Sequence, residues 1–556
     1  MKPERNRLLA EIAVRDSGLG NVEDKVRKNH RKTLGLLRDI AGVKTVGVIS
    51  EYPEKGLTEI ARPVGVVASI VPSTNPGATP ANQVINAVKC GNAIILAPSP
   101  KGWSTCAKLL EFIHAELAKV GAPADLVQML PSPVTKASTH ELMKQCDLVA
   151  ATGSQVKITL WSSFATNLGE EQQKLVDRFN QSQKDVVVEN QFQGTYEETG
   201  QKLTAALQAK QAPDISVLSD VWWFKFYLNK AIVPIDAALK ANNVDKADYV
   251  DAFMNEGTRK GQSYWIPFAR STPLFYYNKD AWKEAGLPDR APETWAEMKE
   301  WAPKLVKKDG NNLTRYAFAY SGANGYIDWS FQSNVWGWGG AYSDENFQVK
   351  IAEKPAVDAG EFARQSVLDG WALSPQNETN DFRSGVAASL IGSTGGLTGH
   401  EANAKFPIGT GFLPKGPVGF GCPTGGAGLG IMAASPKEKQ DAAFKYALFA
   451  SNPEQTAIWS QATGYMPVRK SAINGASMQD FYSKKPNYQT AGKQLALVRG
   501  QDVARVFVPN GQQILLKGLD RITVNKEASE TVMKDIAAAL QKECDAVARQ
   551  VKAVEG

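Results

Sequence analysis

Apolar runs that alternate with amphipathic stretches divide the first 155 residues into strands and helices. The continuous β-branched run at 64–71 is typical of a buried parallel strand, and similar runs follow at 93–97 and 148–152. Between the last two runs, residues 103–120 have the spacing of an amphipathic helix. This alternation predicts a doubly wound α/β unit whose ligand would bind at the carboxyl ends of its strands.

The same alternation begins again after residue 155 and continues over a longer stretch. The pattern predicts a short strand at 157–161, an amphipathic helix at 169–182 and a further strand at 186–192. The end of the chain, 528–554, has one long helical pattern. We therefore expect a second α/β region that is larger than the first.

Composition changes at the same position as the pattern. Of the 13 Trp residues only Trp103 precedes residue 155. A chain of 556 residues is too long for a single core, so several folding units are expected. We predict two parts, a first segment of residues 1–155 and a second segment of residues 156–556.

Charge and cysteine content argue against several classes of function. The net charge of +6 is small for this length and does not resemble the basic face of a nucleic-acid-binding protein. Five scattered Cys without CxxC spacing and four distant His predict neither a disulfide framework nor a metal site. No run approaches the roughly 20 apolar residues of a membrane span, and neither Met1 nor Val156 is associated with a secretory signal. We expect no metal and no nucleic-acid partner.

Three short motifs in the first segment occur where the predicted strands end. They are Val-Pro-Ser-Thr-Asn-Pro at 71–76, Gly-Asn-Ala-Ile-Ile-Leu-Ala-Pro-Ser-Pro at 91–100, and Thr-Gly-Ser at 152–154. Together they resemble the aldehyde dehydrogenase superfamily, most closely its CoA-acylating sulfoacetaldehyde type. The resemblance covers almost all of residues 1–155 and implies a Rossmann-like, nucleotide-binding part of such an enzyme.

The resemblance also implies roles for four residues of the first segment. Asn75 would help to hold an oxyanion, and Ser99 would lie in the turn that carries the ribose of the nucleotide. Gly153 and Ser154 would open the turn at which a helix N-terminus faces the pyrophosphate. The second Gly of that turn and the domain with the nucleophilic Cys do not follow. Because acyl transfer needs an activated thiolate beside oxyanion donors, we predict an incomplete, vestigial fragment, no cofactor and no enzyme.

Four stretches of the second segment share a further pattern. They are Trp-Ser-Ser-Phe at 161–164, Ala-Pro-Asp-Ile at 212–215, Ser-Thr-Pro-Leu-Phe-Tyr-Tyr-Asn-Lys-Asp at 271–280, and Ala-Thr-Gly-Tyr-Met-Pro at 462–467. They resemble the periplasmic solute-binding proteins of carbohydrate-type ABC importers, over all of residues 156–556. The resemblance implies a bilobal periplasmic-binding-protein fold with two discontinuous α/β lobes, a periplasmic or extracytoplasmic location, and an ABC permease in the membrane as partner.

A finer resemblance, to the glycerol-3-phosphate receptors of that family, implies a ligand site of seven residues. Their positions fall on Tyr196, Asp220, Ser271, Ser393, Gly426, Tyr465 and Arg505. A phosphomonoester needs a guanidinium and several neutral donors, and Arg505 with the hydroxyl groups and one backbone amide would supply them. Asp220, where the family has Glu, would accept hydrogen bonds from the hydroxyls of the ligand. The predicted ligand is a phosphorylated glycerol compound.

Departures from the family pattern leave several ligands open. The family's Ser-Gly-Trp-x-Gly-Trp segment is replaced by Ser-Gly-Ala-Asn-Gly-Tyr at 321–326, and Ala323 would open space near the hydroxyl end. A glycerophosphodiester such as glycerophosphocholine therefore competes with glycerol 3-phosphate. Four tryptophans are candidates for an aromatic wall around a choline head or, alternatively, for core packing: Trp222, Trp223, Trp336 and Trp338.

Two other functions and one account of the architecture stay open at this point. A sugar or oligosaccharide receptor of the same fold is the first alternative, and a CoA-acylating aldehyde dehydrogenase with an attached sensing domain is the second. A fusion in which an enzyme fragment replaced a signal peptide, through gene rearrangement, an assembly error or engineering, would explain the order of the two segments.

Overall fold

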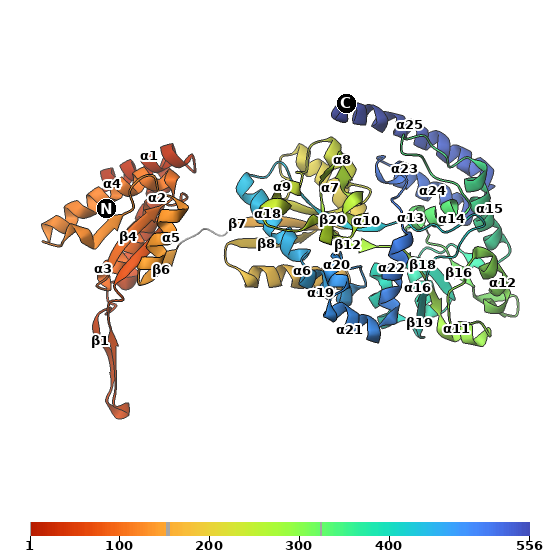
Figure 1. Ribbon diagram of the computed structural model, residues 1–556, viewed down its shortest axis with the longest axis horizontal. Helices are drawn as coiled ribbons and strands as arrows, with labels where there is room; N and C mark the ends of the chain where they lie inside the picture. The colour runs from red at the N-terminus through yellow and green to blue at the C-terminus, as the bar shows by residue number, and fades with distance from the viewer. Residues whose placement is uncertain (1, 152–155, 323–324) are drawn as a thin grey trace. The chain divides into compact units, whose positions relative to one another are not determined.

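The computed structural model describes residues 2–151, 156–322 and 325–556 (Figure 1). The chain forms two compact units, Met1–Gln155 and Val156–Gly556. Each unit combines β-sheet with flanking helices, so the prediction of an α/β protein is confirmed.

The core of the first unit is a four-stranded parallel sheet in the order β5-β4-β3-β6. Its strands are β3 (Val66–Val71), β4 (Ala93–Pro98), β5 (Val127–Met129) and β6 (Leu148–Ala151). Consecutive strands are connected by α3 (Ala78–Lys89), α4 (Trp103–Lys119) and α5 (Lys136–Gln145). The apolar runs of β3 and β4 pair along their whole length and bury Val67, Ile94 and Leu96. Helical crossovers between strands keep all four strands parallel.

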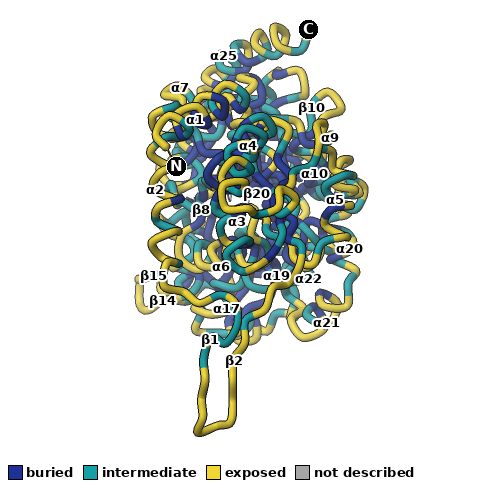
Figure 2. Tube along the Cα trace, turned by 90° about the vertical axis from the view of Figure 1, so that its left-hand side faces the viewer, coloured by how far each residue is buried: buried dark blue, intermediate teal, exposed yellow. Residues whose placement is uncertain are grey.

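Two helices and a β-hairpin of the first unit lie outside this sheet. Helices α1 (Pro3–Ser17) and α2 (Val22–Ile40) pack on each other and on α4 and α3, respectively. Strands β1 (Gly47–Tyr52) and β2 (Leu57–Ala61) form an antiparallel hairpin that is exposed along most of its length (Figure 2). The hairpin was not predicted, because its apolar residues show no clear alternation and a Gly- and Pro-marked stretch surrounds them.

The second unit is built on two five-stranded mixed sheets. The first has the order β12-β20-β9-β7-β8 and the second has the order β17-β16-β18-β13-β19. The strands of the first sheet are β7 (Val156–Ser162), β8 (Val186–Phe192), β9 (Ile215–Ser219), β12 (Ile266–Ser271) and β20 (Gly425–Ile431). The strands of the second sheet are β13 (Pro273–Asn278), β16 (Phe318–Ala319), β17 (Ala372–Leu373), β18 (Ser389–Ser393) and β19 (Ile408–Gly411).

The chain passes from one sheet to the other twice. It leaves the first sheet at the end of β12 and enters β13 after a single residue, Thr272, and it returns between β19 and β20. Each sheet, with its helices, therefore forms a lobe that is assembled from separated parts of the sequence. We call these lobes the first lobe and the second lobe.

Helices cover both lobes. In the first lobe, α6 (Thr166–Ser182) packs on β8 and α7 (Tyr196–Gln208) packs on β9. In the second, α15 (Lys354–Leu368), α24 (Gly511–Thr523) and the long terminal helix α25 (Ser529–Glu555) pack together. No helix in the described ranges is both long and apolar enough to cross a bilayer.

Burial divides the five free cysteines into two groups that differ in expected reactivity. Cys106, Cys422 and Cys544 are fully buried, and burial raises the pKa of the Cys106 thiol to about 12. Cys90 and Cys146 are only partly buried. We expect two thiols to react with Ellman's reagent in the native protein and all five after denaturation, because the reactive form is the thiolate. A Cys146→Ser variant should lose one fast-reacting thiol and a Cys106→Ser variant none. Fast native labelling of Cys106 would contradict this core.

Candidate ligand-binding site

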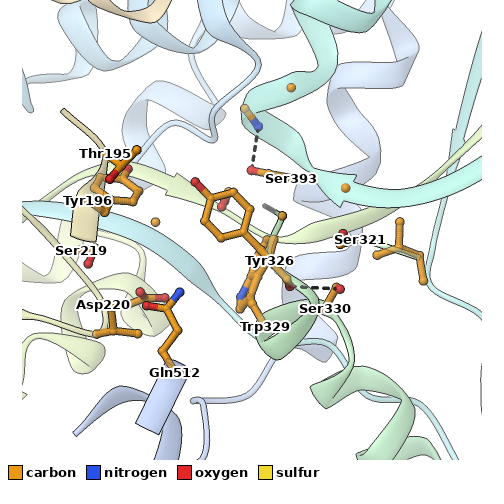
Figure 3. Close-up of a pocket in the computed structure, with 18 of the residues that line it drawn as sticks. Thr195, Tyr196, Ser219, Asp220, Ser321, Tyr326, Trp329, Ser330, Ser393 and Gln512 are labelled. Carbon is orange, nitrogen blue, oxygen red and sulfur yellow. Dashed lines mark hydrogen bonds between the residues drawn. The ribbon is translucent and has the colours of Figure 1, made fainter. Parts of the chain in front are cut away.

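A cavity of about 500 Å³ lies in the second unit and is lined by residues of both lobes (Figure 3). All seven positions predicted from the sequence line it: Tyr196, Asp220, Ser271, Ser393, Gly426, Tyr465 and Arg505. The structure thus brings together residues that are separated by more than half of the chain. Its volume is in the range of small-molecule sites, roughly 300–1,000 Å³.

Strand ends place most of these residues at one edge. Asp220 directly follows β9, Ser271 is the last residue of β12, and Gly426 is the second residue of β20, which runs antiparallel to both. In the second sheet, Ser393 ends β18 and pairs with Pro273, the residue with which β13 begins. The edges of both sheets therefore meet the cavity where the chain crosses between the lobes.

The start of α7 positions Tyr196. The Thr195 hydroxyl accepts from the backbone N–H of Glu198, and the Glu198 carboxylate accepts from the N–H of Thr195. This reciprocal capping box begins the helix at Tyr196. Burial raises the pKa of Tyr196 and raises that of Tyr465 to about 12, so both hydroxyls stay protonated and can donate. The Tyr196 hydroxyl lacks a hydrogen bond of good geometry within the described residues, which leaves it available to a ligand.

A buried ion-pair cluster holds Arg505. Its Nε donates to Asp328 Oδ2 at 2.7 Å, and its Nη1 lies 3.4 Å from Asp220 Oδ2. Burial lowers the pKa of Arg505, but the two carboxylates outweigh this effect and raise it, so the guanidinium stays charged. Nη2 donates no hydrogen bond within the described part of the chain. The guanidinium is therefore already shared with the protein and has one nitrogen left for a ligand.

Gln501 extends this cluster to a second buried arginine. Its amide nitrogen donates to Asp220 Oδ2 at 2.6 Å and to Glu256 Oε1 at 3.0 Å, while its carbonyl oxygen accepts from Arg505. Glu256 in turn pairs with Arg270, whose side chain is fully buried. Burial lowers the pKa of Arg270 to about 10. Its Nε and Nη1 have no hydrogen-bond partner within the described residues.

The sequence analysis missed these supporting residues. Asp328, Glu256 and Gln501 have no motif, and apart from the contact of Gln501 with Arg505, four residues on, they are joined to the site by contacts distant in sequence. Arg270 did carry a signal, because it is the one charged residue in the otherwise apolar or small strand β12, Ile-Pro-Phe-Ala-Arg-Ser. A charged residue inside a buried strand indicates a polar partner or a nearby site.

The aromatic residues that line the cavity are not the four tryptophans named in the sequence analysis. Trp329 lines it and donates through Nε1 to the Thr424 carbonyl oxygen at 2.8 Å. The Tyr326 ring projects into the centre of the cavity (Figure 3). None of the four candidate tryptophans lines this cavity, so the proposed aromatic wall is wrong. Ala323, which would have widened the site, lies outside the described residues.

Each of those four tryptophans is used elsewhere. Trp223 is fully buried in the core, and Trp338 packs on Phe362. Trp336 donates to Asp502 Oδ2 at 3.0 Å. Trp222 lines a separate, smaller cavity and donates to Glu197 at 3.3 Å. Core packing, the alternative that the sequence analysis left open, thus describes Trp223 and Trp338.

In the first unit, Asn75 and Ser99 lie at the carboxyl ends of adjacent strands. Asn75 is in the loop after β3, and its carbonyl oxygen accepts from the N–H of Thr79 at the start of α3. Ser99 follows β4, and its N–H donates to the Val71 carbonyl oxygen at 2.9 Å. The Ser99 hydroxyl is buried without a partner in the described part of the chain. Gly153 and Ser154 lie outside the described residues.

No group of three or more metal-binding side chains occurs within the described ranges.

Comparison with known proteins assigns the second unit to a family and finds a partial match for the first. Residues 174–490 match the family model described as bacterial extracellular solute-binding protein. The sn-glycerol-3-phosphate-binding periplasmic protein UgpB of Escherichia coli is 30% identical over 353 residues, which are 61% of this chain and 80% of that protein. The crystal structure of UgpB from Mycobacterium tuberculosis in complex with glycerophosphocholine superposes with a TM-score of 0.66 at 38% identity, covering 72% of this chain and all of that one. The predicted bilobal fold and both predicted resemblances are confirmed.

The first unit requires a correction. Residues 3–170 match the aldehyde dehydrogenase family, and the acylating sulfoacetaldehyde dehydrogenase of Cupriavidus necator is 70% identical over 160 residues. These residues are 29% of this chain and 32% of that enzyme's length. The prediction that the chain contains no enzyme is wrong, because this region is of an enzyme type. The prediction relied on the missing nucleophile, which says nothing about the family of the residues that are present.

Gly426 allows a close backbone approach beside the cavity. Its φ is +105°, and a Cβ there would lie 2.1 Å from the Ala269 carbonyl oxygen. A Gly426→Ala variant should lose about 3 kcal/mol of unfolding free energy through strain and overpacking. Urea unfolding followed by Trp fluorescence would measure this in the second unit, since only Trp103 lies in the first. Gly419→Ala is the matched control, because nothing lies within 4 Å of its Cβ position. Equal stability of the two variants would refute the close approach.

Proposed function

The chain belongs to the bacterial extracellular solute-binding protein family, and from this we propose that its second unit captures a phosphorylated glycerol compound for an ABC importer. The observation that carries the proposal is the convergence of all seven predicted residues on one cavity between two lobes. The ligand is glycerol 3-phosphate or a glycerophosphodiester. We place the receptor unit in the periplasm or another extracytoplasmic compartment, with a membrane permease as its partner.

The chemistry of the cavity supports a phosphate group. Tyr196, Tyr465, Ser271 and Ser393 offer neutral hydroxyl donors, and Arg505 contributes the positive charge. Charge-assisted bonds of this kind are about twice as strong as neutral ones. One shared guanidinium together with neutral donors gives a binding strength that a carrier can reverse. The names of the two UgpB relatives, one for sn-glycerol 3-phosphate and one solved with glycerophosphocholine, support the same ligand class.

The mechanism is capture between lobes, in which no bond is made or broken. The lobes are connected where β12 continues into β13, where β19 leads to β20, and a third time between α19 (Pro453–Thr463), which packs on the first lobe, and α24 of the second. These three crossings are the candidate hinge. Closure around a ligand would bury it between donors of both lobes. Asp220, on the first lobe, would accept hydrogen bonds from glycerol hydroxyls with the oxygen atom that Arg505 and Gln501 do not engage.

For the first unit we propose that Asn75 and Ser99 occupy the positions of the oxyanion-binding and ribose-binding residues of the aldehyde dehydrogenase family. Both lie at the carboxyl edge of the parallel sheet, where ligands of such sheets bind. Equilibrium dialysis of the whole chain against NAD+ tests this assignment. Saturable binding that Ser99→Ala weakens would support it, and binding that this exchange leaves unchanged would contradict it.

Removal of Arg505 should abolish most of the ligand affinity. We expect Arg505→Ala to weaken glycerol 3-phosphate and glycerophosphocholine binding by at least ~2 kcal/mol, about 30-fold, through loss of the charge-assisted bond. Isothermal titration calorimetry of the whole chain would measure this.

Two controls accompany this experiment. Arg290→Ala removes an arginine that pairs with Glu297 at the surface, and it should leave affinity unchanged. Arg505→Ala also leaves the carboxylates of Asp328 and Asp220 unpaired. The melting temperature of this variant is therefore measured. Arg505→Lys, which keeps the positive charge, is tested in parallel. Wild-type affinity in a folded Arg505→Ala variant would refute the site. Binding of an oligosaccharide but of neither phosphate compound would favour the sugar receptor instead.

A further inference from the structure

Arg270 and Glu256 form a buried ion pair that lies behind the cavity wall rather than in it. The Arg270 guanidinium is fully buried, and its Nη2 donates to Glu256 Oε2. Neither residue is among the described residues that line the cavity. The rings of Phe253 and Trp265 cover the guanidinium, whose central carbon is 5.5 Å and 5.0 Å from their centroids. Such a pair requires an explanation, because it is costly to remove two charges from water.

The local fold does not explain either residue. Arg270 interrupts the apolar or small residues of β12. Glu256 is the last residue of α10 (Asp251–Glu256), where a carboxylate meets the negative end of the helix dipole. Well-packed apolar side chains are often as stable in a core as a buried ion pair, or more stable. Neither charge is therefore required by its own strand or helix.

The next residue in this network is Gln501. Its amide nitrogen donates to Glu256 Oε1 at 3.0 Å and to Asp220 Oδ2 at 2.6 Å. Its amide oxygen accepts from Arg505 Nη1 and, at 3.3 Å, from the side-chain nitrogen of Gln332. These four contacts use both donors and both acceptor positions of the amide.

The contacts leave the Gln501 amide a single orientation. Two carboxylates face its nitrogen, and a guanidinium faces its oxygen. Rotation by half a turn would place the oxygen against both carboxylates and the nitrogen against a cation. Glu256 is a strong acceptor for the amide only while it is charged, and burial opposes that charge. Arg270 supplies the cation that keeps Glu256 ionised.

The orientation of Gln501 determines how Asp220 presents its carboxylate. Gln501 and Arg505 both engage Oδ2 of Asp220, and neither engages Oδ1. Asp220 lines the cavity, so its second oxygen remains for a ligand. Burial lowers the pKa of Arg270, and the charge of Asp220 opposes this effect, so the buried pair and Asp220 also interact directly.

We infer that Arg270 and Glu256 are positioning residues of the ligand site, which act through Gln501 to hold the Asp220 carboxylate for hydroxyl groups of the ligand. This role rests on the proposed function and adds an element of selectivity to it. The ion pair would govern the preference for ligands that carry free hydroxyl groups. Affinity for the phosphate group would depend on Arg505 and the hydroxyl donors of the cavity.

The test uses two matched pairs of ligands, glycerol 3-phosphate with n-propyl phosphate and glycerophosphocholine with n-propyl phosphocholine. The members of each pair share the phosphate group and differ only in the two glycerol hydroxyls. Calorimetry of the whole chain, with displacement titration for the weaker ligands, measures the preference within each pair. We expect the wild-type chain to bind the hydroxylated member at least about tenfold more tightly, because hydrogen bonds to a carboxylate are strong.

Exchange of the ion pair for apolar side chains should remove most of this preference. Arg270→Met combined with Glu256→Leu leaves Gln501 without its second carboxylate, so we expect the hydroxylated ligands to lose at least about tenfold in affinity. The propyl compounds should bind this variant nearly as they bind the wild-type chain. Arg270→Lys, which keeps a cation for Glu256, should retain most of the preference. Wild-type preference in the folded double variant would overturn the positioning role.

A double-mutant cycle examines whether the ion pair acts through Asp220. Asp220→Asn alone should also remove the preference, and exchange of the ion pair in that background should change it little, because residues that act as one network are not additive. Independent, additive losses would contradict the connection through Gln501.

A matched control separates positioning from stability. Arg315→Met removes another largely buried arginine, which pairs with Glu284 at 2.9 Å and donates to the Leu305 carbonyl oxygen at 2.8 Å. It should lower the melting temperature and leave the ligand preference unchanged. If the double variant does not fold, Gln501→Met replaces it, since this exchange leaves the ion pair in place. Wild-type preference in Gln501→Met would then overturn the inference.

Failure of the positioning role and failure of the proposed function give different results. Equal losses for the hydroxylated and propyl ligands in the double variant overturn the positioning role and leave the phosphate site intact. Arg505→Ala should weaken both members of each pair, because they share the phosphate. A wild-type chain that binds none of the four ligands overturns both proposals.

Discussion

The buried ion-pair cluster around Arg505 is the interaction on which the receptor unit depends. Asp220 follows a strand of the first lobe, and Asp328 belongs to α13 (Ile327–Ser330), next to the second. Arg505 contacts both, so a single charge joins the lobes at the wall of the cavity. A buried charge that loses one of its partners is destabilised by several kcal/mol. Separation of the lobes would break the Arg505–Asp220 pair, so this pair favours the closed arrangement of the two lobes.

The seven positions that line the cavity were predicted through the resemblance to a known family, and short motifs carry two of them directly. Ser271 and Tyr465 lie in segments whose residues are adjacent in the chain, and strand ends then bring those segments to one edge. The partners of Arg505 could not be found in this way. Its contacts with Asp328 and Asp220 span 177 and 285 residues, and periodicity carries no information about pairs so distant. The four candidate tryptophans misled for a related reason, since residue type alone does not distinguish a core position from a cavity wall.

The first unit shows that membership of a family and possession of a site are separate questions. Its parallel sheet follows directly from apolar runs and helical crossovers, which is why residues 64–71 and 93–97 were predicted as neighbouring strands. The same sheet brings Asn75 and Ser99 to its carboxyl edge. The resemblance to an aldehyde dehydrogenase was identified, but the prediction of no enzyme was wrong because it relied on the missing nucleophile. The fold of this region is determined by its own core, and that core is present here.

The balance of charge in the cavity narrows what the donors can bind. Burial raises the pKa of both Tyr196 and Tyr465, so these groups remain neutral donors at any physiological pH and contribute no charge of their own. Arg505, the only cationic side chain among the described residues of the lining, is shared with two carboxylates. A phosphodiester carries one negative charge and a phosphomonoester close to two near neutral pH. Neutral donors stabilise both the phosphodiester and the phosphomonoester, but the second negative charge of the monoester would face carboxylates rather than cations. Under the proposed function, the lining would therefore accept one phosphate charge more readily than two.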